Sequence, residues 1–412
     1  MVRTSFDDLL PGHKYYYRLH YGREKDKTAT SGAGIFKTNP GAKNQADLAM
    51  VIVTGMNYYH FHYGNYDSTK AYNGPDKALG YPALKSVLAL APDYFIGTGD
   101  NVYFDHPNEQ GFKNSLKNHK KPHPGGYDGK EVVDEAGMRR KYHEQFSQQN
   151  FKALFAKTAT YWEKDDHDYR LNDADPYTDF AISHELGINN FKEQLPVVYP
   201  GHKGTTYRTH QLSKDLQLWF LEGRDYRDAN EMTDGPTKSL WGKEQLAWLK
   251  SSLLQSTATY KILVSPTPMV GPDDAYKRDN HVNPDGFRYE GEAFFDWLID
   301  NGFLDKNFYI VCGDRHWKYH ARHPKGIEEF STGALVDNNA RPGRLAGDPQ
   351  STDPDGKIIQ YYIQGTEEQA SGGFLLVKIA LDSIAKLQFQ FYDEQGKMLY
   401  QAIKNPVAED GQ

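Results

Sequence analysis

The sequence predicts an α/β fold in which polar clusters follow buried strands and meet at one edge of a sheet. Three short runs have the β-branched or aromatic composition of buried strands: Asp93–Gly97, Ala159–Trp162 and Phe308–Cys312. A polar cluster follows each run: GTGDNVY (Gly97–Tyr103), KDDHDY (Lys164–Tyr169) and CGDRH (Cys312–His316). Ligands of open α/β sheets bind just beyond the carboxyl ends of the strands. Asp100 and His316 are therefore expected to converge on one crevice, and a split metal site is the leading hypothesis.

Composition and charge limit the classes of partner. At 412 residues and 47.0 kDa the chain is long enough to bury a core in one large domain or two. A formal net charge of −7 and a pI near 6.1 argue against general affinity for nucleic acid or anionic membranes. The mean hydropathy is −0.76 and no run of about eighteen apolar residues occurs, which excludes a membrane span. The single cysteine, Cys312, lies in an apolar strand and is expected to be a buried structural thiol.

Residues 1–41 are expected to form a partial β segment. Between Leu10 and Thr38 the chain has a Pro-Gly turn, a tyrosine-rich strand and a last strand before a Pro-Gly exit. This stretch resembles the closing strands of a fibronectin type III domain. Such sandwiches need about 100 residues, so the segment is expected to leave unpaired strand edges. We therefore expect the natural protein to be longer than this chain.

Residues 42–412 are expected to form one α/β catalytic domain, because strands and helices alternate from there onward. Strands are predicted here at Leu48–Thr54, Tyr94–Gly97 (within the run Asp93–Gly97 given above), Gln217–Leu221 and Tyr260–Ser265. A helix is predicted over Lys77–Ala91, and apolar residues at three- and four-residue spacing predict two more, around Leu246, Leu249 and Leu253 and around Phe294, Leu298 and Ile299. A C-terminal hairpin that turns at Glu394–Gly396 is expected to complete a second sheet.

The first polar cluster offers a carboxylate and a phenol one helical turn apart. Two glycines let the backbone turn sharply before Asp100, and Tyr103 lies three positions further on. A carboxylate can bridge two cations. A phenol, which titrates near pH 10, binds as phenolate only when a strong Lewis acid such as ferric iron displaces its proton. A helix-capping aspartate beside a packed tyrosine is the alternative.

The second cluster crowds several carboxylates around one imidazole. Crowding of this kind costs repulsion unless cations or donors neutralise Asp165, Asp166 and Asp168, so a positive group is expected close by. Asp166 is the expected ligand. His167 points the other way and is placed to contact substrate or protonate a leaving group. A solvated acidic turn is the alternative.

The third cluster is an Asp-x-His pair that leaves an apolar strand. An extended backbone places Asp314 and His316 on one face while Arg315 points away. Two side chains of the metal-ligand type then converge, which favours a metal site over a packed histidine.

A fourth polar segment, LEGRDYRD, follows the strand that ends at Leu221. Arg224 and Arg227 lie beyond that strand end, and either can make a bidentate phosphate contact. The alternative is a structural ion pair with Asp225 or Asp228. The segment Gln110–Tyr127 carries lysines and histidines without an acid, and near the crevice it could attract anionic substrates.

Together these motifs resemble those of a known family. GDNVY, DDHDY followed by Asn172 and Asp173, LEGRDYR, a GKEQLAWLK helix and GDRH occur in the order seen in the PhoD-like alkaline phosphatases of the calcineurin-like metallophosphatase superfamily. The resemblance covers about Ala46 to Ala380. It implies a four-layer sandwich, in which two mixed β-sheets are flanked by helices, and a fibronectin-like sandwich commonly precedes that domain.

The resemblance also implies a role for each matching residue. It implies that Asp100 bridges two metals, that Tyr103 and His316 bind a ferric ion, and that Asp166 and Asp314 hold the second ion, often calcium. His167 and Arg224 are expected to face the phosphate. Further candidates for substrate binding are Asn172 and Arg227.

The chain departs from the family where a metal ligand is usual. The family usually has Ser-Cys-Gln after the first strand, with the cysteine on the iron, whereas this chain has Gly55 at the cysteine position. Asn57, His60 and His62 are candidate substitutes, and a different ligand set changes which metal is preferred. Manganese, zinc and magnesium are therefore candidate metals in addition to iron and calcium.

The expected function is metal-dependent hydrolysis of a small-molecule phosphate ester, in which a metal-bound hydroxide attacks phosphorus. A phosphodiesterase or phospholipase D-like activity is the near alternative, because aromatic residues in the active-site segments could form an apolar rim: Tyr58, Tyr59, Phe61, Tyr63 and Phe104. A non-catalytic metal-containing binding protein is the alternative from another class. By resemblance the protein is expected in the periplasm or outside the cell. The sequence leaves the oligomeric state and the natural substrate open.

Overall fold

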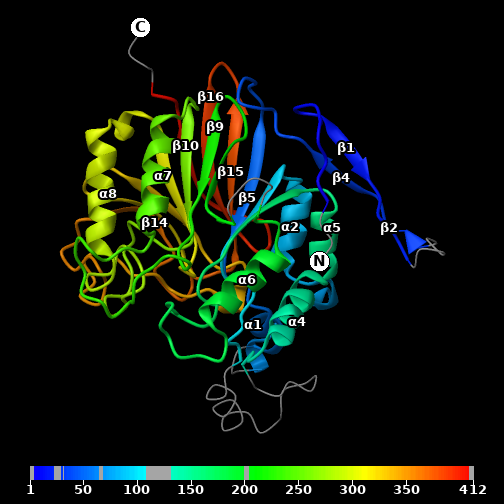
Figure 1. Cartoon of the computed structure of the whole chain (residues 1–412), viewed down its shortest axis with the longest axis horizontal. Coiled ribbons are helices and arrows are strands. Elements are labelled where there is room, and N and C mark those ends of the chain that lie inside the picture. Colours follow the sequence, from blue (N-terminus) through cyan, green and yellow to red (C-terminus); the bar gives the residue numbers. More distant parts are fainter. Residues whose placement is uncertain are drawn as a thin grey trace.

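Two mixed β-sheets lie face to face between layers of helices in the computed structural model of the chain (Figure 1). The structure describes residues 4–22, 29–30, 32–64, 68–107, 131–198 and 204–407. The predicted segment Gln110–Tyr127 lies outside the described residues. The predicted fold class, a four-layer metallophosphatase-type sandwich, is confirmed by this arrangement.

The six-stranded sheet has the order β17-β16-β15-β5-β6-β7. Its bounds are β5 Leu48–Val53, β6 Tyr94–Thr98, β7 Ala159–Glu163, β15 Gly373–Leu381, β16 Ala385–Asp393 and β17 Met398–Lys404. Strands β5, β6 and β7 run parallel, and β15 pairs antiparallel with β5. The C-terminal hairpin predicted from the sequence therefore completes a sheet with the first strand of the domain.

The seven-stranded sheet has the order β14-β12-β13-β11-β10-β9-β8. Its bounds are β8 Arg208–Gln211, β9 Leu216–Phe220, β10 Tyr260–Ser265, β11 Phe308–Cys312, β12 Lys318–Arg322, β13 Glu328–Thr332 and β14 Ile359–Ile363. Strands β9, β10, β11 and β13 run parallel, so their carboxyl ends share one edge. The other strands pair antiparallel at the two sides.

The core has three parts because each sheet buries both faces. Alternate residues of β5 separate to the two sides: Met50 and Ile52 face the other sheet, whereas Val51 and Val53 face helices. Helices α2 (Pro82–Leu90), α4 (Glu135–Phe146) and α5 (Gln149–Phe155) cover the six-stranded sheet. Helices α7 (Lys243–Leu254) and α8 (Arg288–Asp300) cover the seven-stranded sheet.

The predicted helix over Lys77–Ala91 is wrong in its first turns. A short 3₁₀ turn, η2 (Lys77–Leu79), comes first, and α2 begins only at Pro82. Gly80 has a φ of 98°, which no helix accommodates, and proline is favoured at the first helical position because its missing N–H needs no partner there. The helix therefore starts after this break.

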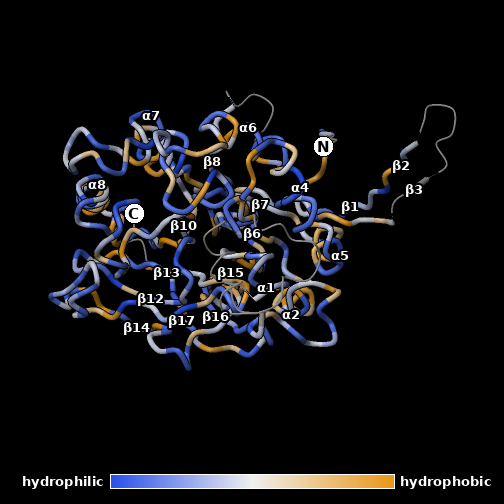
Figure 2. The backbone as a smooth tube through the Cα atoms, turned by 90° about the horizontal axis from the view of Figure 1, so that it is seen from below, coloured by the Kyte–Doolittle hydropathy of each residue, from blue (hydrophilic) through white to orange (hydrophobic). Residues whose placement is uncertain are grey.

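The N-terminal segment forms a ribbon that projects from the two-sheet body, as Figure 2 shows. Strand β1 (Lys14–Tyr17) pairs antiparallel with β4 (Gly34–Lys37), and β2 (His20–Tyr21) pairs with β3 (Ala29–Thr30). The ribbon rests on the body through a hydrogen bond from Ile35 N to Ala156 O at 2.7 Å. Among the described residues no further strand pairs with these four, and the resemblance to a fibronectin domain stays a prediction.

Two further helices lie near the carboxyl ends of the strands: α1 (Tyr58–Tyr63) and α6 (His184–Gln194). Each begins with a capping side chain, Asn57 or Ser183, that accepts a hydrogen bond from a backbone N–H of the first turn. Across the described ranges, every helix is too short or too polar to span a bilayer.

Candidate active site

Asp100, Tyr103 and His316 meet where the two sheets present their strand ends. Tyr103 Oη donates a hydrogen bond to Asp100 Oδ2 at 2.9 Å. His316 Nε2 lies 3.1 Å from the same carboxylate oxygen and 3.3 Å from the phenol oxygen. The loops that follow β6 and β11 thus bring two side-chain oxygens and one side-chain nitrogen close together.

The backbone around Asp100 is held in a conformation that few residues adopt. Asp100 and Asp314 have φ values of 53° and 60°, in the left-handed region that aspartate tolerates better than bulky residues. Gly99 precedes the first with a φ of 99°, and a Cβ there would lie 2.5 Å from the Cβ of Asp165. The glycine therefore lets two site-forming loops approach each other closely.

A group of buried carboxylates continues from this point. Ligand-type atoms of Asp100, Asp166 and His167 all lie within 4.8 Å of one another. A second group of the same kind consists of Asp166, Asp173 and Asp279. Among the described residues, Asp100 Oδ1 and both carboxylate oxygens of Asp279 are buried without a hydrogen-bond partner, although Arg224 NH2 forms an ion pair with Asp279 Oδ2 at 3.7 Å. Buried carboxylate oxygens need a positive partner, so the donor set fits bound cations.

His167 is held by a carboxylate that the sequence reasoning missed. Its Nδ1 lies 2.7 Å from Asp105 Oδ1, and both side chains are buried. Burial lowers the pKa of His167, but the negative charges of Asp105, Asp166 and Asp100 outweigh it and hold that pKa well above its usual value. The raised pKa favours a protonated imidazole, whose Nδ1–H can donate to Asp105.

His316 has the opposite protonation state. Burial lowers the pKa of His316 well below its usual value, and the positive charges of Arg341, His167 and Arg315 add to the effect. Burial also raises the pKa of Asp100. The positive charge of His167 lowers this pKa, but the neighbouring carboxylates of Asp166 and Asp165 raise it further. A neutral imidazole is the form of histidine that binds a metal, so His316 is ready to act as a ligand.

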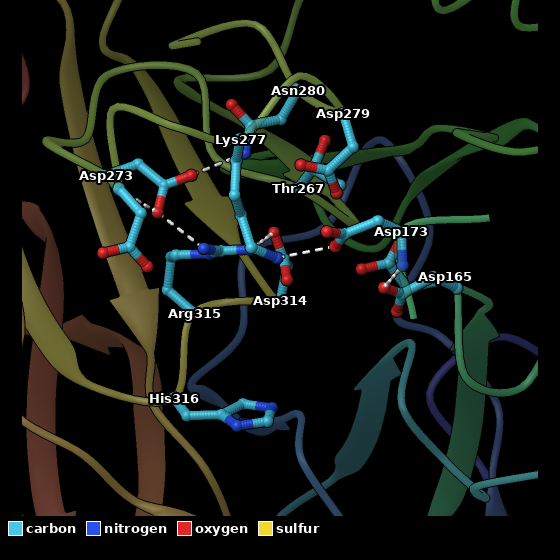
Figure 3. Close-up of polar contacts among 12 residues, drawn as sticks. Asp165, Asp173, Thr267, Asp273, Lys277, Asp279, Asn280, Asp314, Arg315 and His316 are labelled. Atoms are coloured by element: carbon cyan, nitrogen blue, oxygen red, sulfur yellow. Dashed lines mark hydrogen bonds and ion pairs between the residues drawn. The ribbon is translucent and has the colours of Figure 1, made fainter. Parts of the chain in front are cut away.

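The side chains enclose a polar cavity of about 390 Å³. Its wall consists of Asp100, His167, Asn172, Asp173, Tyr276, Lys277, Asp314, Arg315, His316 and Arg341. Figure 3 shows Lys277 and Arg315 directed toward the carboxylates of this wall. Arg315 donates to Asp273 at 2.5 Å and to Asp314. Five residues expected from the sequence thus line the cavity: Asp100, His167, Asn172, Asp314 and His316.

The arginines expected to face the phosphate do not line the cavity. Arg224 is fully buried, and its Nε donates to Asp165 Oδ1 at 2.8 Å while its NH1 donates to Ala174 O. Arg227 donates to Gly223 O and Asn230 Oδ1. Internal acceptors hold Arg224, whereas NH2 of Arg227 is buried with no hydrogen-bond partner among the described residues. A phosphate contact of either arginine stays a prediction. Arg224 supplies the positive charge that the second cluster was expected to need.

Asn57 has a structural task in place of the expected ligand role. Its Oδ1 accepts a hydrogen bond from His60 N at 2.9 Å and so caps α1, and its Nδ2 lies 2.8 Å from His106 Nδ1. A Cβ at residue 55 would lie 2.9 Å from the Cβ of Ala334 and 3.2 Å from Asn339 Nδ2, and this amide nitrogen donates to Tyr103 Oη at 2.9 Å. The position of the usual cysteine therefore brings no ligand here.

The aromatic residues expected as an apolar rim are mostly core. Tyr59, Phe61 and Phe104 are buried, and Phe61 and Phe104 belong to the cluster under the six-stranded sheet. Neither they nor Tyr58 and Tyr63 line the cavity. The wall of the cavity is charged, and these aromatic side chains do not form the apolar rim that was expected for a lipid-like ester.

The loop between β10 and α8 is the main part of the site that sequence reasoning missed. It contributes Tyr276 and Lys277, and its Asp273 and Asp274 hold Arg315, Arg341 and Arg344. The signal was present, because GPDDAYKRDN follows the predicted strand Tyr260–Ser265, but five residues separate them.

Comparison with known proteins places these features in a family. The family model described as PhoD-like phosphatase matches residues 61–368. The chain is 25% identical over 285 residues to alkaline phosphatase D of Bacillus subtilis (strain 168), which covers 64% of this chain and 44% of that protein. The chain thus spans less than half the length of this curated relative.

Solved structures share the fold. A structure of PhoD superposes with a TM-score of 0.69 at 19% identity, covering 97% of this chain and 75% of that one. The purple acid phosphatase PPD1 from yellow lupin (Lupinus luteus) seeds superposes with a TM-score of 0.57 at 11% identity, covering 97% and 60%. At these identities the likeness concerns the fold alone.

Proposed function

The chain belongs to the PhoD-like phosphatase family, and from this premise we propose that it hydrolyses phosphate esters with the help of two bound cations. The observation that carries the proposal is the meeting of Asp100, Tyr103 and His316 within 3.3 Å beside a cavity lined with both carboxylates and cations. Carboxylates hold metal ions and cations hold phosphate, and a phosphate ester hydrolase needs both.

The proposed ligands divide into two sets that share one carboxylate. Asp100, Tyr103 and His316 would hold one cation, and Asp166 and Asp314 would hold the other, with the Asp100 carboxylate available to both. The partnerless Asp100 Oδ1 and the short distances among ligand-type atoms of Asp100 and Asp166 support this division. When bound, the cations supply Lewis-acid chemistry: they neutralise phosphate charge and make water a nucleophile at neutral pH.

His167 is the proposed general acid. Its raised pKa favours a proton on both nitrogens, Asp105 lies 2.7 Å from Nδ1, and the ring lines the cavity. Nε2 can therefore donate its proton to the leaving alcohol oxygen while Asp105 keeps the ring in place. Asn172 N also donates to Asp105 Oδ2 at 3.0 Å, which fixes the carboxylate that orients the imidazole.

The proposed cations are ferric iron and calcium, with manganese, zinc or magnesium as alternatives. Tyr103 favours a strongly acidic ion, because only such an ion displaces a phenol proton near neutral pH. Because Gly55 stands at the position of the usual cysteine, the site has no thiolate ligand from that position, and the proposed donors are oxygen and imidazole nitrogen. Metal analysis of the purified protein decides among these ions.

The direct test combines metal analysis with an ester panel. Protein purified without chelator is expected to contain metal and to release nitrophenol from para-nitrophenyl phosphate. Treatment with a chelator should abolish turnover, and each candidate ion should then be added back separately. Full activity in metal-free protein contradicts the proposal. Stoichiometric metal without turnover on any ester favours a binding protein instead.

Diester hydrolysis is the second candidate, and one observation favours it. A further polar cavity of about 530 Å³ shares Asp173, Tyr276 and Lys277 with the first, so an ester with a second alcohol group has room to extend. The ratio of bis-para-nitrophenyl phosphate to para-nitrophenyl phosphate turnover separates the two activities. Export to the periplasm or the cell exterior stays a proposal that rests on the family resemblance.

A further inference from the structure

Lys277 brings a positive charge to the cavity from a loop outside the recognised motifs. It lies between β10 and α8, and its side chain is 10% exposed. Its Nζ donates to Asp173 Oδ1 at 2.6 Å, and it lines the same cavity as Asp100, Asp314 and His316 (Figure 3). The ammonium group therefore lies among the residues proposed to bind the cations.

The other cations of the wall are less available to a ligand. Arg315 is buried and donates to Asp273 and Asp314. Arg341 is 42% exposed, donates to Asp274 at 3.0 Å and lies over the ring of Trp317. An exposed, solvated guanidinium contributes less to affinity than a buried charge.

Lys277 keeps donors for a ligand. An ammonium group has three N–H donors. Among the described residues its Nζ donates to Asp173, which uses one of the three. Because the side chain lines the cavity, the other two are placed to meet an anion there.

The position of the ammonium is fixed relative to the proposed cation ligands. Asp173 N donates to Asp166 Oδ2 at 2.7 Å, so the counter-ion of Lys277 is tied to a proposed ligand. On the other side, Lys277 N donates to Asp274 O at 3.3 Å, and Asp274 is held by Arg341 and Arg344. Asp173 holds the ammonium and Asp274 O holds the backbone of the same residue, so Lys277 loses little freedom when it binds substrate.

We propose that Lys277 binds the non-bridging oxygens of the phosphate ester and sets the affinity of the site for phosphate dianions. This inference rests on the proposed function, since it assigns a contact to the same site. A monoester dianion carries one more negative charge than a diester monoanion. Loss of Lys277 is therefore expected to weaken monoester binding more than diester binding.

The first experiment compares variants of two neighbouring basic residues, Lys277 and Arg278. Lys277→Met is expected to raise the inhibition constant of orthophosphate, and the KM for para-nitrophenyl phosphate, by about ten- to a hundredfold, as for the loss of a charged hydrogen bond. The KM for bis-para-nitrophenyl phosphate should rise less. Arg278→Met is the matched control, because it removes the same charge from the next residue, whose 45%-exposed guanidinium pairs with Glu231. Arg278 lines only the second cavity, so its loss should change the orthophosphate constant and the KM for para-nitrophenyl phosphate by less than about threefold.

The second comparison separates binding from a structural ion pair. Asp173→Asn frees Lys277 from its counter-ion and should lower the inhibition constant of orthophosphate, whereas a purely structural pair predicts a loss in both single variants. The double variant Lys277→Met with Asp173→Asn leaves no unpaired charge, so it remains informative if Lys277→Met alone does not fold. It should bind orthophosphate as weakly as Lys277→Met. Metal content and melting temperature are measured for every variant.

The outcomes distinguish the two hypotheses. An unchanged orthophosphate constant in folded, metal-loaded Lys277→Met or in the double variant overturns the role of Lys277, and so does an equal loss in Arg278→Met. Calorimetric titration with orthophosphate does not depend on turnover. If no ester is hydrolysed but orthophosphate binding follows the expected pattern, the proposed function fails and the Lys277 contact stands.

Discussion

Asp100 Oδ2 and His316 Nε2 lie 3.1 Å apart although 216 positions separate the two residues in the sequence. Each residue follows the last residue of a buried parallel strand, one in each sheet, by two to four positions. The face-to-face packing of the two sheets therefore assembles the site, and neither sheet alone contains a complete ligand set.

Replacement of these two residues tests whether they hold cations. We expect Asp100→Asn to lose at least one metal ion per chain and to lower kcat by at least about a hundredfold, because a buried charge in the reaction centre is removed. His316→Ala should lose the cation shared with Tyr103. Atomic absorption and ester turnover measure both effects. Asp285→Asn, which changes an exposed aspartate, is the control, and unchanged metal content in Asp100→Asn contradicts the assignment.

The role of His167 as a general acid predicts an effect that depends on the leaving group. His167→Asn should lower kcat by about 10²–10⁴ for an alkyl phosphate, whose alkoxide needs a proton. The loss should be much smaller for para-nitrophenyl phosphate, whose nitrophenolate leaves without one. Equal losses on both esters would indicate a structural role instead.

Gly99 is expected to tolerate no side chain. Gly99→Ala combines a positive φ with a Cβ 2.5 Å from that of Asp165, so we expect the free energy of unfolding to fall by about 3 kcal/mol or more. Gly204→Ala is the control, because its φ of 77° is strained but nothing lies within 4 Å of the added Cβ. It should cost about 1 kcal/mol. Urea unfolding measures both, and equal losses contradict the close approach of the loops.

Arg224 is expected to stabilise the fold. Arg224→Met leaves Asp165 buried without its partner, which should cost about 3–5 kcal/mol of unfolding free energy. Removal of both charges in Arg224→Met with Asp165→Asn should recover part of that loss. If Arg224→Met instead raises only the KM for the ester and leaves stability unchanged, the arginine contacts substrate after all.

Glu394 lies away from the candidate site, and its raised pKa predicts that the stability of the fold depends on pH. Burial raises the pKa of Glu394 to about 7, and the charge of Asp337 adds to the rise. Between its unfolded pKa of about 4.3 and the folded value, the folded state keeps a proton that the unfolded state has lost, so stability falls as pH rises. Relative to wild type, Glu394→Gln should gain about 1–3 kcal/mol between pH 4 and pH 8. Parallel curves of melting temperature against pH contradict this.

Local pattern was sufficient for most strands of the two sheets, but β8, β12, β13 and β14 were not predicted. Continuous apolar runs such as Tyr260–Ser265 and Phe308–Cys312 coincide with β10 and β11. A run of this kind is stable only when both of its faces are buried, so composition alone indicates the central position of the strand. Helix starts were less certain, because at Gly80 and Pro82 a two-residue break overrides the apolar spacing.

The sequence by itself determined most of the strands, the acidic and imidazole groups at their ends, and the family, because each of these is a property of short segments. Only the tertiary structure decided which cations line the cavity. Arg224 is enclosed because Asp165, 59 positions earlier, accepts its hydrogen bonds, and Lys277 enters the cavity because Asp173, 104 positions earlier, holds it there. The partner of a charged side chain is chosen by distance in space and by the cost of leaving a buried charge unpaired, and neither quantity is written in local sequence.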